Sequence, residues 1–165
     1  MKIYLALFFI LLSGCTTVPK YSYQSQASTD PVFVFGDRFG GGSVNSPARS
    51  LGINTKDAAA NRCADFEEIG TTSNHWMRLK SPTIQIKTPA GRAIAIRSSY
   101  LYSSGTIITT CVPSPLMFIP REGATYSVDV EMIKRACQLS IVQKLSDGQQ
   151  EKVDGVTVLP VCKDK

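Results

Sequence analysis

Alternation of apolar and polar residues within short stretches is the feature that most limits what this chain can fold into. One face of residues 124–132 (ATYSVDVEM) carries Tyr126, Val128, Val130 and Met132. The residues between them are polar. Successive side chains of a β-strand point to opposite faces, so this stretch predicts a strand with one buried and one solvated face, as antiparallel sheets commonly have.

Other short runs repeat this alternation or are rich in β-branched and aromatic residues. They predict strands at residues 32–35, 75–80, 83–87, 92–102, 106–111, 137–145 and 155–161. Between two of them, TPAG at 88–91 has proline second and glycine fourth, as a type I turn prefers. We therefore expect 83–87 and 92–102 to form a hairpin.

One stretch, residues 55–69, shows helical rather than strand spacing. Its apolar residues recur at Ala59, Cys63 and Phe66, with Asn54 or Thr55 as the cap. Many short strands and a single helix predict an all-β fold, either a sandwich or a small barrel, and we favour an antiparallel β-sandwich with one short helix.

The N-terminus has Lys2 and then an apolar run of ten residues, 3–12. A helix of that length spans about 15 Å, roughly half of a bilayer core, so it predicts a cleaved secretory signal and not a membrane-spanning helix. The run ends in Leu12-Ser13-Gly14-Cys15. This sequence resembles the lipobox of bacterial lipoproteins at all four positions.

The resemblance implies that residues 1–14 are a lipoprotein signal peptide and that Cys15 carries the lipid, as palmitate labelling would detect. Residues 15–31 are rich in Ser, Thr and Gln and predict a flexible lipidated tether. Residues 32–165 then form one domain with one core. In the enterobacterial members of the family an Asp after the lipid-bearing Cys favours the inner membrane. Thr16 therefore implies the outer membrane, on its periplasmic face.

Residues 118–130 (FIPREGATYSVDV) combine an apolar-proline pair, a glycine turn and an alternating strand. Over about residues 116–145 the chain is similar to small bacterial lipoproteins with PEGA-like or transthyretin-like domains. This resemblance implies a sandwich of the immunoglobulin or transthyretin kind and carries no catalytic residues.

The chain has five cysteines, and lipidation of Cys15 leaves four. An even number in an oxidising compartment predicts two disulfides. Strand parity favours Cys63–Cys111 and Cys137–Cys162 among the three pairings. A zinc site would need close Cys-x-x-Cys spacing and histidine partners, which the sequence does not offer, so we expect no metal and no cofactor.

Two motifs invite a catalytic or nucleotide-binding interpretation. Three glycines of residues 35–43 (FGDRFGGGS) are consecutive and precede residues that predict loop, so the stretch fits neither a phosphate loop nor a dinucleotide site. His75 is the single histidine, and no nucleophile motif accompanies it. The sequence predicts no catalytic site, with an envelope enzyme that uses His75 as an alternative.

The charge distribution is the remaining signal. The chain has formal charge +5, and no acidic residue falls between Ile69 and Arg121. The basic residues of this stretch predict either an ordinary solvated face or a basic surface for anionic lipid headgroups or an acidic partner. The candidate residues of such a surface are Lys80, Lys87, Arg92 and Arg97. We expect no nucleic acid or nucleotide partner in this compartment.

These observations together predict a non-enzymatic lipoprotein that acts as a binding or structural accessory of the cell envelope. Its expected partners are the membrane, through the lipid, and an envelope protein that the sequence does not identify. An inhibitor of a host or envelope hydrolase is a further alternative.

Overall fold

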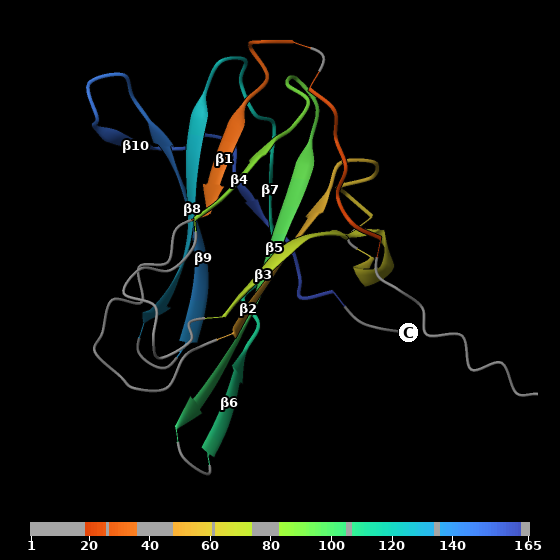
Figure 1. The fold of residues 1–165 in the computed structure, drawn as a ribbon, viewed down its shortest axis with the longest axis vertical. Helices are drawn as coiled ribbons and strands as arrows, with labels where there is room; N and C mark the ends of the chain where they lie inside the picture. Colours follow the sequence, from red (N-terminus) through yellow and green to blue (C-terminus); the bar gives the residue numbers. More distant parts are fainter. Residues whose placement is uncertain are drawn as a thin grey trace, which may run out of the picture.

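The computed structural model describes residues 19–25, 27–35, 48–60, 62–73, 83–104, 107–133 and 136–162. In this part of the chain eleven strands form two sheets (Figure 1). The predicted strand at 75–80 lies outside the described residues.

The first sheet has the strand order β10-β9-β8-β1-β4. Its strands are β1 (Val32–Phe35), β4 (Ile84–Lys87), β8 (Thr125–Ile133), β9 (Ala136–Lys144) and β10 (Gln150–Lys152). β1 pairs antiparallel with β4 but parallel with β8. The expectation of a wholly antiparallel fold is therefore wrong at this pair. A parallel pair needs a long crossover, and the chain between β1 and β8 supplies one.

The second sheet has the order β11-β7-β5-β2-β3, and β6 also pairs with β5. Its strands are β2 (Ala48–Asn54), β3 (Glu67–Ser73), β5 (Ile94–Ser104), β6 (Ile107–Cys111), β7 (Leu116–Phe118) and β11 (Thr157–Val158). β5 is long enough to pair first with β7 and then with β6. In Figure 1 the end of β5 and β6 extend together beyond the other strands.

The core lies between the two sheets. Phe33 and Tyr126 of the first sheet stack with ring centroids 5.0 Å apart. Phe118 of the second sheet meets both, at 5.8 Å from Phe33 and 5.3 Å from Tyr126. Each such ring removed from water contributes about 1.5–3 kcal/mol, so this aromatic cluster joins the sheets.

The structure confirms strands within the predicted ranges 32–35, 83–87, 92–102, 106–111, 124–132, 137–145 and 155–161. The inward faces are also as expected for Tyr126, Val128 and Val130. The polar face of β8 is not solvated, however, because Ser127 and Asp129 are buried. Ser127 lies between partners in β1 and β9, and its hydroxyl donates to the Asp129 carboxylate at 3.4 Å, contacts that an isolated strand pattern does not reveal.

The predicted hairpin of 83–87 with 92–102 is wrong, because β4 lies in the first sheet and β5 in the second. The connection crosses between the sheets and is fixed by other segments. Thr88 is fully buried and its N–H donates to the Pro31 carbonyl oxygen at 3.1 Å. Gly91, with φ 73°, donates its N–H to the Pro120 carbonyl oxygen at 3.0 Å. Two alternating strands can bury their apolar faces across a core as well as side by side.

The predicted helix over 55–69 is also wrong. The described part of this stretch holds only a 3-10 turn, Cys63–Asp65, and the start of β3. The Asn54 carboxamide accepts the N–H groups of Lys56 at 3.0 Å and Asp57 at 3.1 Å, so it caps a tight turn. Burial of Phe66 and pairing of the next residues with β2 outweigh the local helical spacing.

Candidate functional site

The cysteines pair differently from the prediction. The structure joins Cys63 to Cys162, with Cα atoms 5.2 Å apart, and Cys111 to Cys137, with Cα atoms 6.0 Å apart. The expected Cys63–Cys111 and Cys137–Cys162 bridges are therefore corrected. Parity indicates which face of a strand a cysteine occupies, but the partner depends on which element covers that face.

The Cys63–Cys162 bridge lies over the outer face of the second sheet. In β5, Ile94 and Ile96 face the core, and the residue between them, Ala95, faces outward. A second small apolar cluster covers the outer face at this point. It consists of Ala58, Phe66, Ala95 and Leu159. The segments that carry Cys63 and Cys162 thus cover the outer face of the second sheet at this point.

Arg97 is the next residue on the same outward face of β5, and its guanidinium contacts an aromatic ring and a sulfur atom. Its guanidinium carbon lies 4.8 Å from the ring centroid of the buried Phe66. Its Nη1 donates to the Cys162 Sγ at 3.6 Å. Placement of a guanidinium over an aromatic face is favourable, and more so when the pair is partly desolvated.

Gly52 makes room for this arrangement. It is the partner of Arg97 in the pairing of β2 with β5, and on its other side the register of β2 with β3 shifts after Leu51. A Cβ at Gly52 would lie 2.9 Å from the Arg97 Nε and 3.4 Å from the Phe66 Cβ. Glycine in a strand often marks such a close approach. The Arg97 side chain therefore lies directly against the backbone of β2.

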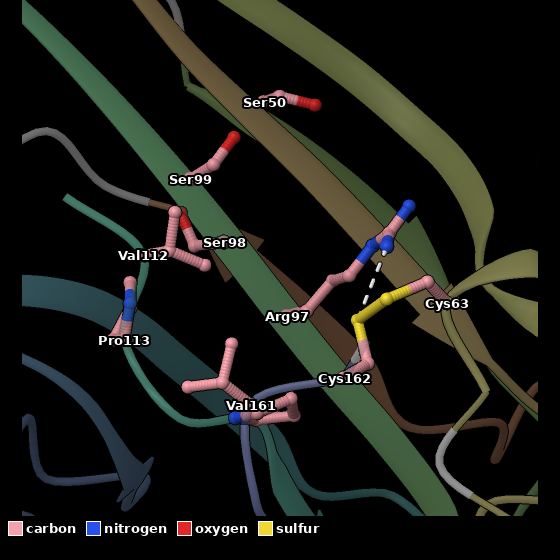
Figure 2. Close-up of a pocket in the computed structure, with 10 residues that line it drawn as sticks. Ser50, Cys63, Arg97, Ser98, Ser99, Val112, Pro113, Val161 and Cys162 are labelled. Atoms are coloured by element: carbon pink, nitrogen blue, oxygen red, sulfur yellow. Dashed lines mark hydrogen bonds between the residues drawn. A yellow bond between two sulfur atoms is a disulfide. The ribbon is translucent and has the colours of Figure 1, made fainter. Parts of the chain in front are cut away.

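A cavity of about 220 Å³ opens beside Arg97 and the disulfide (Figure 2). Its remaining wall comes from residues 112–115, which connect β6 to β7 along the edge of β5. Pro113 and Pro115 have no N–H to donate, so regular pairing with β5 is interrupted there. The lining residues are Ser50, Cys63, Arg97, Ser98, Ser99, Val112, Pro113, Pro115, Val161 and Cys162.

The segment before β1 is docked on the domain. Tyr21 donates its N–H to the Glu68 carbonyl oxygen at 2.8 Å, and Glu68 donates its N–H to the Pro19 carbonyl oxygen at 2.8 Å. The Tyr21 ring packs on the core, and its hydroxyl donates to the Lys87 carbonyl oxygen. The flexible tether expected over 15–31 is thus corrected for residues 19–25 and 27–31.

Asp30 organises the end of this segment. Its buried carboxylate accepts hydrogen bonds from the Tyr23 hydroxyl at 3.1 Å, the Ser25 hydroxyl at 2.9 Å and the Ala27 N–H at 3.4 Å. A carboxylate taken out of water is costly unless such donors satisfy it. The segment is thereby folded back on itself before β1 begins.

The predicted basic surface is only partly assembled. Lys87 donates its ammonium to the Ser25 hydroxyl of the docked segment at 3.3 Å. The charge of Arg92 acts on the phenol of Tyr21, so Arg92 belongs to the same region. Arg97 belongs instead to the cavity, and Lys80 lies outside the described residues.

The other predicted sites lie outside the described residues, namely Cys15, His75 and most of the glycine stretch 35–43. Across the described ranges, no three His, Cys, Asp or Glu side chains gather as metal ligands do. The same part of the chain has no helix with the length and apolar character needed to cross a membrane.

Sequence reasoning assigned Arg97 to a charged face and did not find the cavity. The available signal was Gly52, an isolated glycine between two apolar residues of a strand, which marks a close approach. What approaches Gly52 is set by the pairing of β2 with β5. Comparison of the sequence with protein-family models and with curated proteins finds no match.

Proposed function

We propose that this chain is a lipid-anchored protein of the bacterial envelope, with a disulfide-stapled β-sandwich of the immunoglobulin or transthyretin kind that acts as a non-enzymatic binding module. The observation that carries the proposal is the Leu12-Ser13-Gly14-Cys15 sequence shortly before a domain with two disulfides. Disulfides persist in oxidising compartments, which agrees with export. The outer membrane, on its periplasmic face, is the proposed location.

The docked segment changes how such an anchor would work. A tether over 15–31 would let the domain move up to about 55 Å from the lipid, at about 3.5 Å per residue. Pro19, where the described contacts with the domain begin, is only four positions after Cys15, and four residue steps span at most about 14 Å. The domain would therefore stay close to the headgroups.

Short anchoring would place the docked segment and its neighbours nearest the membrane. Lys20 and Arg92 are exposed there, and Lys87 is half-buried. Each basic residue near an anionic surface contributes about 1 kcal/mol within a Debye length. Lys20, Lys87 and Arg92 would then orient the domain, while the cavity beside Arg97 would serve the ligand.

Labelling of cells with radioactive palmitate tests the anchor. The expected result is labelled protein in the outer-membrane fraction and no label on Cys15→Ala. A Cys111→Ala/Cys137→Ala variant is the matched control, since it removes cysteines and keeps the lipidation sequence. Undiminished label on Cys15→Ala would contradict the proposal.

A further inference from the structure

We propose that the cavity beside the Cys63–Cys162 bridge binds a carboxylate that bears a short apolar substituent. This inference rests on the proposed role as a binding module and names the chemical class of its ligand. The cavity is lined by one guanidinium, three serine side chains and an apolar wall, and each part selects one feature of the ligand.

The guanidinium selects the carboxylate. Arg97 is pre-positioned by the Phe66 ring, the Cys162 sulfur and the close approach of Gly52, so a ligand would not have to order a free side chain. A guanidinium presents five N–H donors in a planar fork that matches a carboxylate. Because Phe66 is fully buried and apolar, the charge is held in a partly desolvated place, where an anion is bound more strongly than in water.

The hydroxyl groups select polar atoms next to the carboxylate. Ser50 and Ser99 are partners in the register of β2 with β5, and Gly52 is likewise the partner of Arg97 two residues along. Side chains directly opposite each other on one face lie about 4.5–5.5 Å apart at Cβ. The two serines therefore form a polar strip that continues from Arg97 along the outer face of the sheet (Figure 2).

The apolar wall selects a short side chain. Val112 and Val161 are 50% and 45% exposed although they flank a cavity, so contact with an apolar group would remove surface that is now in water. Pro113 and Pro115 extend this wall and keep it stiff. Figure 2 shows Val112 beside Ser98 and Val161 near Cys162.

The size of the cavity limits the ligand. A volume of 220 Å³ equals that of about seven waters at about 30 Å³ each and is below the range of about 300–1,000 Å³ for drug-sized ligands. It therefore suits one amino-acid-sized carboxylate, either as a small molecule or as the last residue of a peptide. Both sources present the same chemistry to Arg97.

The test titrates the full chain in detergent micelles and follows its amide resonances by nuclear magnetic resonance. The probes are N-acetylvaline, its uncharged analogue N-acetylvalinamide, acetate, and the tripeptide Gly-Gly-Val. We expect N-acetylvaline to bind at least about tenfold more tightly than either the amide or acetate, since each control lacks one selected feature. Tighter binding of the tripeptide would assign the site to peptide C-termini, and weaker binding to small carboxylates.

Two variants test whether binding of N-acetylvaline depends on Arg97 itself or on the positive charge of the protein in general. Arg97→Gln should weaken binding of N-acetylvaline by about tenfold or more, whereas Arg121→Gln, which removes an exposed arginine near Asp154, should leave it unchanged. Gly52→Ala keeps the charge but displaces Arg97, and should also weaken binding. If Arg97→Gln does not fold, Gly52→Ala and the comparison of acid with amide still test whether the cavity binds a carboxylate at Arg97.

Equal affinity for acid and amide, or an undiminished affinity in Arg97→Gln, would overturn the carboxylate site. Absence of any binding by palmitate-labelled protein would overturn the site and leave the anchor standing. Carboxylate binding by a chain that takes no palmitate would overturn the anchor and leave the site standing.

Discussion

The phenol of Tyr21 donates a hydrogen bond to the carbonyl oxygen of Lys87, 2.9 Å away, although 66 positions separate the two residues in the sequence. The contact ties the docked segment to the edge strand of the first sheet, and the ring packs on the main core. Tyr21 is therefore the residue through which the stability of the docked segment can be measured.

Tyr21→Phe should lower the free energy of unfolding by about 0.5–1.5 kcal/mol, the usual net value of one hydrogen bond, because the ring remains and only the hydroxyl is lost. Urea denaturation of both proteins measures the difference. Tyr21→Ala should cost more, since the buried part of the ring is lost as well. A Tyr21→Ala variant as stable as the wild type would show that the segment is not docked in solution.

The same residue predicts a pH dependence. Burial, followed by the charges of Tyr23 and Glu67, raises the pKa of Tyr21 above its ordinary value of 10.0. The folded state therefore favours the neutral phenol, and this contribution to stability is fully present below pH 10 and is lost as the pH rises above it. Stability measured from pH 8 to 11 should fall more steeply in the wild type than in Tyr21→Phe. Identical slopes would contradict the burial of the hydroxyl.

The disulfides predict an order of stabilities. They close loops of 99 and 26 residues, for which the chain-entropy model gives about 4.7 kcal/mol for Cys63–Cys162 and about 3.5 kcal/mol for Cys111–Cys137. The double variant Cys63→Ala/Cys162→Ala should thus unfold at lower urea than Cys111→Ala/Cys137→Ala. Non-reducing peptide mapping checks the pairing itself, and a linked Cys63–Cys111 peptide would contradict the structure.

Short anchoring predicts which lysines a membrane protects. The lipidated chain in anionic vesicles should show slower reaction of Lys20 and Lys87 with an amine reagent than in neutral vesicles, and high salt should remove the difference. Lys152 of β10 is the internal control, because β10 and β4 are opposite edges of the first sheet. Equal protection of Lys20 and Lys152 would indicate that the docked segment does not face the lipid.

The sequence by itself determined where most strands are and which of their faces is apolar. In β5 and β8 the inward positions of Ile94, Ile96, Val128 and Val130 follow from alternation alone. This information is local, because the period of a strand is fixed by its backbone and needs no knowledge of neighbours. The even number of cysteines after Cys15 similarly predicted two bridges without reference to the fold.

Only the tertiary structure decided which elements meet. Alternation is the same for two strands of one sheet and for two strands that face each other, so β4 and β5 were predicted as a hairpin although they lie in different sheets. The apolar residues around Phe66 have helical spacing, but the structure instead buries Phe66 on the outer face of the second sheet. Arg97 had the charge of a surface residue, and its place over Phe66 and beside Cys162 arises from contacts between residues 31 and 65 positions apart in the sequence. Pairings over such distances depend on how whole faces are covered, and no local pattern records that.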